Sequence, residues 1–180
     1  CPQCPAGRAT ASNGTKTCPE CTVGKVQNLP GQSACSDCAT GLFMPLQGKQ
    51  VCDACKPGTF ANVTGLSVCY ACEPGTSQPL SGASACPLCT VGKATKLFGQ
   101  QNCASCPTGR ATAANGTVEC ALCQQGLFQS GNGATACDPC QLGKFNNGLG
   151  LTSCAFCSAG SFANVTGQTF CYDCEKATFQ

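Results

Sequence analysis

The stretch Cys52-Asp53-Ala54-Cys55-Lys56-Pro57-Gly58-Thr59-Phe60-Ala61-Asn62-Val63-Thr64-Gly65-Leu66-Ser67-Val68 is one copy of a unit that recurs along the whole chain. We count its first cysteine as position 1, so that cysteines occupy positions 1 and 4 and glycines occupy positions 7 and 14. The first cysteines of successive Cys-x-x-Cys pairs lie 17 residues apart from Cys1 to Cys171, and all 22 cysteines belong to such pairs. A fixed period of this kind is the signature of a repeat protein.

The two glycines of each repeat determine its expected local structure. Each glycine costs about 1 kcal/mol inside a helix, so two in every 17 residues exclude helices. The pattern instead predicts a short strand, a turn and a return strand; in the quoted repeat these would be residues 58–61, 62–65 and 66–69. Asn-Gly pairs at positions 13 and 14 suit a primed hairpin turn. Position 7 requires either a positive φ or a close backbone approach. The structural turns are expected at the glycines of both positions, represented by Gly7, Gly14, Gly58 and Gly65.

The predicted fold class is small, disulfide-rich and mostly β-hairpin and coil, without helix. Residues 1–180 form one continuous tandem array of ten complete repeats and a partial repeat from residue 171, and we expect a fragment of a longer repeat chain. The array is predicted to be an elongated solenoid or rod in which contacts reach only adjacent repeats. Position 9 is the regular apolar site and is interpreted as the repeat core, with a binding strip as the alternative. Its phenylalanines are Phe43, Phe60, Phe128, Phe145, Phe162 and Phe179.

Composition limits the classes of function. Charged residues make up 10% of the chain and the formal net charge is +2, so no electrostatic footprint for nucleic acid is present. No apolar run approaches the roughly 20 residues that span a bilayer. A chain with 22 cysteines in 180 residues is typical of disulfide scaffolds from oxidising compartments. We therefore expect an extracellular or cell-surface location, reached through the secretory pathway.

Four Asn-x-Thr sequons agree with that location and predict N-linked glycans at Asn13, Asn62, Asn115 and Asn164. Asn13 and Asn115 are 102 residues apart, and so are Asn62 and Asn164. This distance is six repeats. The regular spacing indicates that the sequons did not arise by chance.

Three periodic schemes can pair the cysteines. Neighbouring pairs can interlock, as in Cys1–Cys18 with Cys4–Cys21; each Cys-x-x-Cys can close on itself; or the second cysteine of one repeat can bond the first of the next. The first scheme groups repeats in twos, although the sequence shows no such alternation, and the second makes strained small rings. The third closes loops of 15 residues, each bridge contributing about 3 kcal/mol in the chain-entropy model. We favour the third scheme, and the other two remain alternatives.

The segment from Cys55 through Pro57, Gly58 and Phe60 to Gly65 and Cys69 resembles the unit of ephrin-receptor-like repeats and the first loop of tumour necrosis factor receptor cysteine-rich repeats. This chain lacks the second, interlocked module that those receptors insert between such loops. The resemblance implies the third pairing scheme. The predicted bridges are Cys4–Cys18, Cys21–Cys35, Cys38–Cys52, Cys55–Cys69, Cys72–Cys86, Cys89–Cys103, Cys106–Cys120, Cys123–Cys137, Cys140–Cys154 and Cys157–Cys171, and Cys1 and Cys174 have no partner within the sequence.

Competing chemistries have less support. Two Cys-x-x-Cys pairs 13 residues apart come near the spacing of four-cysteine zinc sites, but eleven pairs is an odd number. Histidine is absent, and the pairs are too alike for one to be a specialised redox centre. We expect no enzyme activity, no metal and no cofactor. The cations at position 8 are either a basic row for anionic polysaccharide or solvated side chains, and we favour the latter; they are Arg8, Lys25, Lys93, Arg110 and Lys144.

These observations predict a structural extracellular glycoprotein that forms, or belongs to, a disulfide-stabilised fibre, stalk or surface appendage. The alternative is a receptor or adhesin ectodomain that binds protein or glycan ligands. The expected partners are the chain itself, through continuation of the repeats or lateral filament packing, and N-linked glycans. Neither nucleic acid nor a membrane span is expected.

Overall fold

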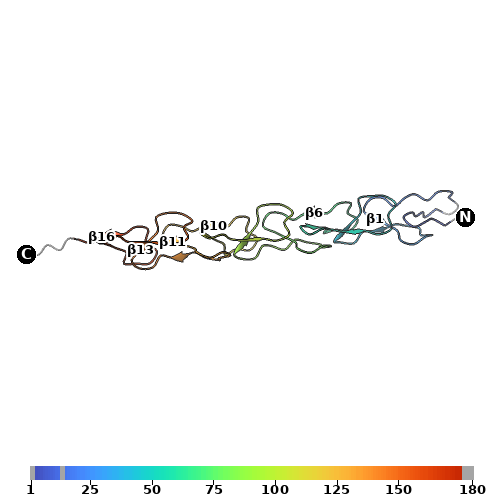
Figure 1. Cartoon of the computed structure of the whole chain (residues 1–180). Helices are drawn as coiled ribbons and strands as arrows, with labels where there is room; N and C mark the ends of the chain where they lie inside the picture. Colours follow the sequence, from blue (N-terminus) through green and yellow to red (C-terminus); the bar gives the residue numbers. More distant parts are fainter. Residues whose placement is uncertain (1–2, 13–14, 176–180) are drawn as a thin grey trace, which may run out of the picture. The chain divides into compact units, whose positions relative to one another are not determined.

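The computed structural model describes residues 3–12 and 15–175. Within these ranges the chain forms short strands and loops and no helix (Figure 1). The contacts divide it into two compact units, Cys1–Pro87 with Leu97–Asn102 and Leu88–Lys96 with Cys103–Gln180. The predicted class, a disulfide-rich fold of β-hairpins and coil in tandem repeats, is confirmed for these residues.

Each hairpin joins positions 8 and 9 of one repeat to positions 2 and 3 of the next. The strands have two residues each, and every pair is an antiparallel two-stranded sheet. In the first compact unit the pairs are β1 (Lys25–Val26) with β2 (Ser36–Asp37), β3 (Leu42–Phe43) with β4 (Asp53–Ala54), and β5 (Thr59–Phe60) with β6 (Tyr70–Ala71). In the second they are β7 (Lys93–Ala94) with β8 (Ala104–Ser105), β9 (Arg110–Ala111) with β10 (Ala121–Leu122), β11 (Leu127–Phe128) with β12 (Asp138–Pro139), β13 (Lys144–Phe145) with β14 (Ala155–Phe156), and β15 (Ser161–Phe162) with β16 (Tyr172–Asp173).

The return strand lies later in the sequence than predicted. Phe60 in β5 pairs with Tyr70 in β6, so the return strand sits between the two cysteines of the next Cys-x-x-Cys pair and not at residues 66–69. The carbonyl of Leu66 instead accepts a hydrogen bond of 3.0 Å from the N–H of Met44 in the preceding repeat. The segment before the cysteine therefore satisfies its backbone through a neighbouring repeat.

A tight turn precedes each outgoing strand. In Lys56-Pro57-Gly58-Thr59 the N–H of Thr59 donates to the carbonyl of Lys56 at 3.0 Å, and Gly58 has a φ of 81°. A positive φ at the third residue, with proline before it, is the arrangement of a type II turn. This turn directs the chain from the buried Cys55 into β5.

Position 14 does not form the primed two-residue turn that the Asn-Gly pairs suggested. Such a turn needs a positive φ at both central residues, whereas glycines alone have positive φ among the described residues. Gly116 has a φ of 71°, and its N–H donates to the carbonyl of Cys89 in the preceding repeat at 2.7 Å. The loop therefore folds against its neighbour and does not close its own hairpin. Gly14, predicted as a turn, lies outside the described residues.

The position-7 glycines have a positive φ and also lie very close to the backbone of another repeat, so both explanations offered for them apply. Gly58 has a positive φ, and a Cβ built on it would lie 2.1 Å from the carbonyl oxygen of Gly99, which is position 14 of the next repeat but one. Gly7 has a φ of 85° and stands in the same relation to Gly48, at 2.2 Å. The contact recurs between Gly24 and Gly65, Gly41 and Gly82, Gly92 and Gly133, Gly109 and Gly150, and Gly126 and Gly167. Contacts thus reach second neighbours, which corrects the expectation that they reach only adjacent repeats.

The buried interior lies mainly at positions 4 and 10, and position 9, the expected core, is buried only where it holds alanine, at Ala9, Ala94 and Ala111. The position-4 cysteines from Cys21 to Cys140 are at most 1% exposed, and position 10 buries Gln27, Met44, Ala61, Gln78, Asn146 and Ala163. Among the predicted core residues, Phe43, Phe60, Phe128 and Phe145 are half-buried, Phe162 is 41% exposed, and Phe179 lies outside the described residues. The interior at position 9 therefore accommodates a small side chain and leaves the larger phenylalanine ring partly in solvent.

Candidate functional site: the disulfide series and the repeat surface

Disulfides link each repeat covalently to the next. The structure contains the ten bridges of the third scheme, from Cys4–Cys18 to Cys157–Cys171, each with a sequence separation of 14 residues. Cα–Cα distances lie between 5.6 and 5.8 Å. Cys174 is unbonded and exposed, and Cys1 lies outside the described residues.

The bridges also determine which sulfur chemistry these cysteines can perform. A disulfide sulfur is not a thiolate, which is the form that ligates metals and attacks electrophiles. Within residues 3–12 and 15–175, no group of three or more cysteine, histidine or acidic side chains is placed to hold a metal ion. In this oxidised form the cysteines serve as cross-links.

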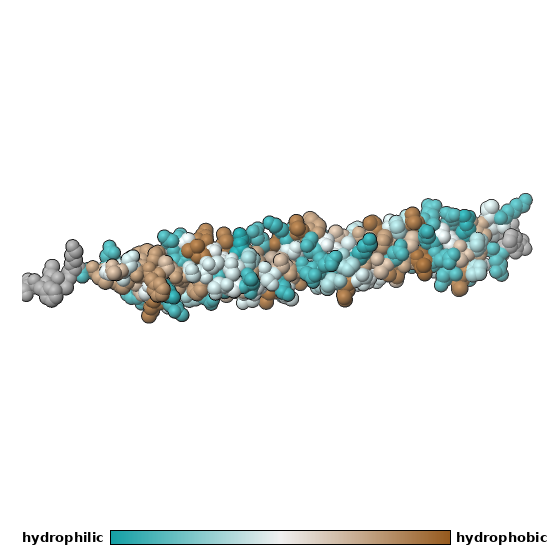
Figure 2. Space-filling model, viewed as in Figure 1, coloured by the Kyte–Doolittle hydropathy of each residue, from teal (hydrophilic) through white to brown (hydrophobic). Residues whose placement is uncertain are grey.

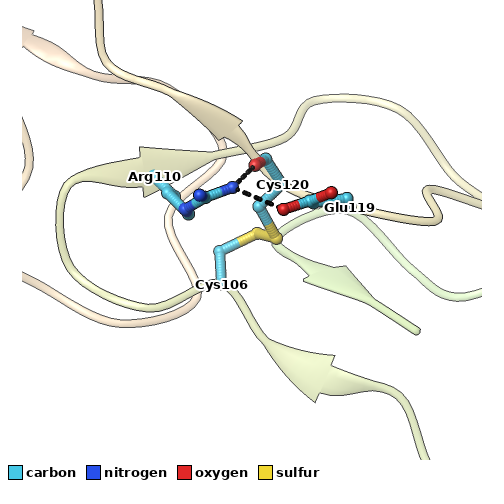
Figure 3. Close-up of polar contacts among 4 residues, drawn as sticks. All are labelled: Cys106, Arg110, Glu119 and Cys120. Atoms are coloured by element: carbon cyan, nitrogen blue, oxygen red, sulfur yellow. Dashed lines mark hydrogen bonds and ion pairs between the residues drawn. A yellow bond between two sulfur atoms is a disulfide. The ribbon is translucent and has the colours of Figure 1, made fainter. Parts of the chain in front are cut away.

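The position-8 arginines contact groups at the end of their own loop. Arg110 in β9 directs its guanidinium toward the Cys106–Cys120 bridge (Figure 3). Its Nη1 donates to the carbonyl of Cys120 at 2.8 Å and to Glu119 Oε1 at 3.0 Å. Arg8 likewise donates to the carbonyl of Cys18 at 2.9 Å and forms an ion pair with Glu20.

Two of the position-8 lysines also have partners across their hairpins. Lys25 Nζ lies 2.8 Å from Asp37 Oδ1, and Lys144 Nζ lies 4.5 Å from the centroid of the Phe156 ring. The side chains of Lys25 and Asp37 remain nearly half exposed, so the pair adds little to stability. Four of the five position-8 cations therefore have local partners, which favours the solvated-side-chain interpretation over a row for binding polyanions.

Buried glutamines at position 10 were not identified from the sequence. Gln78 donates from Nε2 to the carbonyl of Ala85 at 2.9 Å, and its Oε1 accepts from the N–H of Leu80 at 3.0 Å. The buried Gln27 and the half-buried Gln129 make the same two types of bond within their own loops. The three glutamines are spaced by three repeats, and each has alanine at position 17 of its repeat. This pairing of glutamine with alanine is the sequence signal that would have revealed them.

The sequons lie on the surface wherever the structure describes them. Asn62, Asn115 and Asn164 are exposed, and Asn13 lies outside the described residues. The Oδ1 of Asn115 accepts a hydrogen bond of 3.1 Å from the N–H of Val91. A glycan is attached through Nδ2, so this bond is compatible with glycosylation.

Position 12 places a row of aliphatic side chains on the surface of the first compact unit. Leu29, Leu46, Val63, Leu80 and Leu97 belong to five successive repeats and are between 51% and 69% exposed. The next three repeats have Ala114, Gly131 and Gly148 at this position. On the face shown in Figure 2, hydrophobic residues lie singly or in small groups among hydrophilic ones.

Shallow hollows lie beside the hairpins. One of them, in the first compact unit, has a volume of about 280 Å³ and is lined by Phe60, Asn62, Glu73 and Thr76, among others. In the second compact unit, a hollow of about 270 Å³ lies beside Phe145 and Asn147.

Together these features define a class of protein: a tandem array of cysteine-rich repeats joined by disulfides. Arrays of this kind fit an extracellular structural or surface protein, because stable disulfides are characteristic of oxidising compartments. No protein-family model matches the chain, and no curated protein matches it. Within the described ranges, no helix has the length and apolar character needed to cross a membrane.

Proposed function

We propose that this protein is a structural extracellular glycoprotein that forms, or belongs to, a disulfide-stabilised fibre, stalk or surface appendage. The observation that supports this most directly is the linkage between repeats. A bridge such as Cys55–Cys69 ties one repeat to the next, and a glycine contact such as that of Gly58 with Gly99 reaches the repeat after that. An array linked in this way resists local opening, which is what a load-bearing element requires.

The energetics favour mechanical and proteolytic resistance. Each bridge closes a 15-residue loop and contributes about 3 kcal/mol by restricting the unfolded chain. Residues that form no large core of their own thus gain order from covalent links, as in other small disulfide-rich domains. We infer no catalytic role, since the chain has no histidine and its described cysteines, except Cys174, are bonded to one another.

The likeness to ephrin-receptor-like and tumour necrosis factor receptor loops belongs to this proposal. The bridge from Cys55 to Cys69 closes a loop like the one that defines the resemblance. We propose that the chain uses only this loop type and repeats it without the second receptor module. A uniform series of loops suits a scaffold better than a single ligand site.

The position-12 row supports lateral packing between copies of the array. Contiguous exposed apolar residues mark interaction surfaces more often than isolated ones do. The row also favours the alternative, a receptor or adhesin ectodomain, because it occupies five successive repeats and is then interrupted for three repeats before Val165. In the first case the row binds a second copy of the chain; in the second it binds a different protein.

Secretion from a eukaryotic host, followed by thiol counting and electron microscopy, tests the proposal. We expect at most two free thiols per unfolded chain, those of Cys1 and Cys174, and extended particles that lose their form on reduction. Twenty-two free thiols or compact round particles would contradict it. The double variant Leu46→Ser with Leu80→Ser distinguishes the structural protein from the receptor or adhesin. Loss of self-association in this variant supports lateral packing between copies. Particles that are monomeric both with and without the substitutions favour the receptor.

A further inference from the structure

The four sequons fall into two kinds. Asn62 and Asn164 occupy position 11, and a phenylalanine at position 9 precedes each by two residues. Asn13 and Asn115 occupy position 13, and the residues two before them are Ala11 and Ala113. The two kinds alternate along the chain, so each provides an internal control for the other.

An aromatic pair accompanies each position-11 sequon. Phe60 pairs across its hairpin with Tyr70, and Phe162 pairs with Tyr172. The ring centroids of each pair are 5.9 Å apart. These are the only two tyrosines in the chain, so the combination occurs at both position-11 sequons and in no other repeat.

The aromatic pairs present part of their surface to solvent. Tyr70 is 48% exposed and Tyr172 is 44% exposed. Cross-strand aromatic pairs stabilise a two-stranded sheet, but that role requires only contact between the rings. The exposed ring surface is available to a further group.

The hollow beside Asn62 has the lining that a sugar ring requires. Phe60 provides an aromatic surface, while Glu73 and Thr76 provide polar groups, and Asn62 itself lies at the edge of the same space. Its volume of about 280 Å³ is just below the range of roughly 300–1,000 Å³ typical of ligand pockets. This size suits one monosaccharide better than an oligosaccharide.

We propose that the first N-acetylglucosamine on Asn62 packs in this hollow against the Phe60 ring, which Tyr70 contacts from across the hairpin. The one on Asn164 packs in the same way against Phe162, the equivalent ring of the second pair. The negative face of an aromatic ring attracts the weakly positive C–H groups on one side of a pyranose. The hydroxyl and acetamido groups of the sugar then face Glu73, Thr76 and solvent. This inference rests on the glycosylation in the proposed function and adds a defined position for the sugar.

Attachment uses a lipid-linked saccharide diphosphate as co-substrate. The bond formed joins Asn62 Nδ2 to C1 of N-acetylglucosamine, and the bond broken joins C1 to the diphosphate oxygen. The lipid diphosphate departs with the bonding electrons, and Nδ2 loses one proton to the transferase. No electron is gained or lost by the protein.

Nuclear magnetic resonance of the secreted full chain tests the packing. The glycans carry ¹³C label and are trimmed enzymatically to one N-acetylglucosamine at each site. We expect ring currents to shift the sugar protons on Asn62 upfield of those on Asn115, and the shift to vanish in Phe60→Val. Valine is a conservative choice, because Val26 occupies position 9 in another repeat.

Amide exchange gives a second readout. The N–H of Ala61 lies between Phe60 and Asn62 and donates to the carbonyl of Ala83 at 3.0 Å. The sugar should slow its exchange roughly twofold to tenfold, in line with the worth of an aromatic contact. Phe60→Val should abolish this gain, whereas Phe43→Val, in a repeat with Pro45 at position 11, should leave it unchanged.

The outcomes separate this inference from the proposed function. Suppose that Asn62 is glycosylated, but the chemical shifts of its sugar protons equal those on Asn115 and do not change in Phe60→Val. This result overturns the proposed packing and leaves the proposed function, a structural glycoprotein, unaffected. If the protein is secreted with its disulfides formed but mass spectrometry finds no glycan on Asn62, the proposal for this site alone is overturned. Protein that carries 22 free thiols overturns the proposed function itself.

Discussion

Replacement of Gly58 by alanine tests whether contacts between second-neighbour repeats hold the array together. The new Cβ would lie 2.1 Å from the carbonyl oxygen of Gly99 and 2.8 Å from its carbonyl carbon. Both are backbone atoms, so no flexible side chain can move aside. Gly58 also has a φ of 81°, which alanine adopts only with strain.

Gly58→Ala lowers the free energy of unfolding in two ways, through strain of the backbone at residue 58 and through steric displacement of Gly99. The backbone strain is about 1–2 kcal/mol, and the smaller freedom of the unfolded alanine chain offsets about 0.4–1 kcal/mol of it. Displacement of Gly99 adds about 1–3 kcal/mol of overpacking. It also weakens the Gly99 N–H bond to Cys72 (2.8 Å) and the Gly58 N–H bond to Gln78 (2.7 Å), at about 1 kcal/mol each. The steric part therefore totals about 3–5 kcal/mol.

Gly143 provides the matched control. It occupies position 7 with a φ of 75°, and in the 180-residue chain, which does not include position 14 of the next repeat but one, a Cβ there would meet nothing within 4 Å. Gly143→Ala should therefore show the strain without the clash. The two variants differ in the presence of a second-neighbour carbonyl, and so their comparison isolates that contact.

Hydrogen exchange at equivalent amides measures the difference. The N–H of Cys72 donates to the carbonyl of Gly58 at 2.9 Å, and the N–H of Cys157 donates to that of Gly143 at 3.0 Å. We expect exchange at Cys72 in Gly58→Ala to accelerate by roughly a hundredfold or more, since 1.4 kcal/mol corresponds to a factor of ten. Exchange at Cys157 in Gly143→Ala should accelerate by less than about tenfold. Equal acceleration at both amides would refute the steric argument.

Three further predictions concern the bridges, the buried glutamines and the ion pairs. Cys55→Ser with Cys69→Ser should cost about 3 kcal/mol locally and open residues 56–68 to limited proteolysis, with the other loops as uncut controls; an uncut loop would contradict the role of the bridge. Gln78→Met preserves an unbranched buried side chain but removes two hydrogen bonds. Amide hydrogen exchange in residues 79–86 should therefore accelerate by an amount equivalent to about 1–3 kcal/mol. Unchanged exchange would show that packing alone orders the loop. Lys25→Met removes an exposed ion pair and should change the denaturation midpoint by the equivalent of less than about 1 kcal/mol; a larger loss would make that pair a structural element.

The sequence alone was sufficient for features that depend on local chain chemistry. The absence of helix follows from the glycine frequency, whereas for Gly58 the sequence offered a positive φ or a close backbone approach without deciding between them. The Cys55–Cys69 bridge agrees with the scheme that closes one loop at a time. Each of these features lies within 17 residues, the range over which composition and spacing act.

The tertiary structure decided how repeats meet, because this depends on the rotation and rise from one repeat to the next. No single repeat encodes these quantities. They place Gly99 against Gly58 across two repeats and direct Leu66 toward Met44, so that the return strand falls at Tyr70–Ala71. They also bury position 10, and they bury position 9 only where it holds alanine, as at Ala94 and Ala111. The interior between stacked loops accommodates the disulfides and these small side chains, while the phenylalanine rings remain partly exposed.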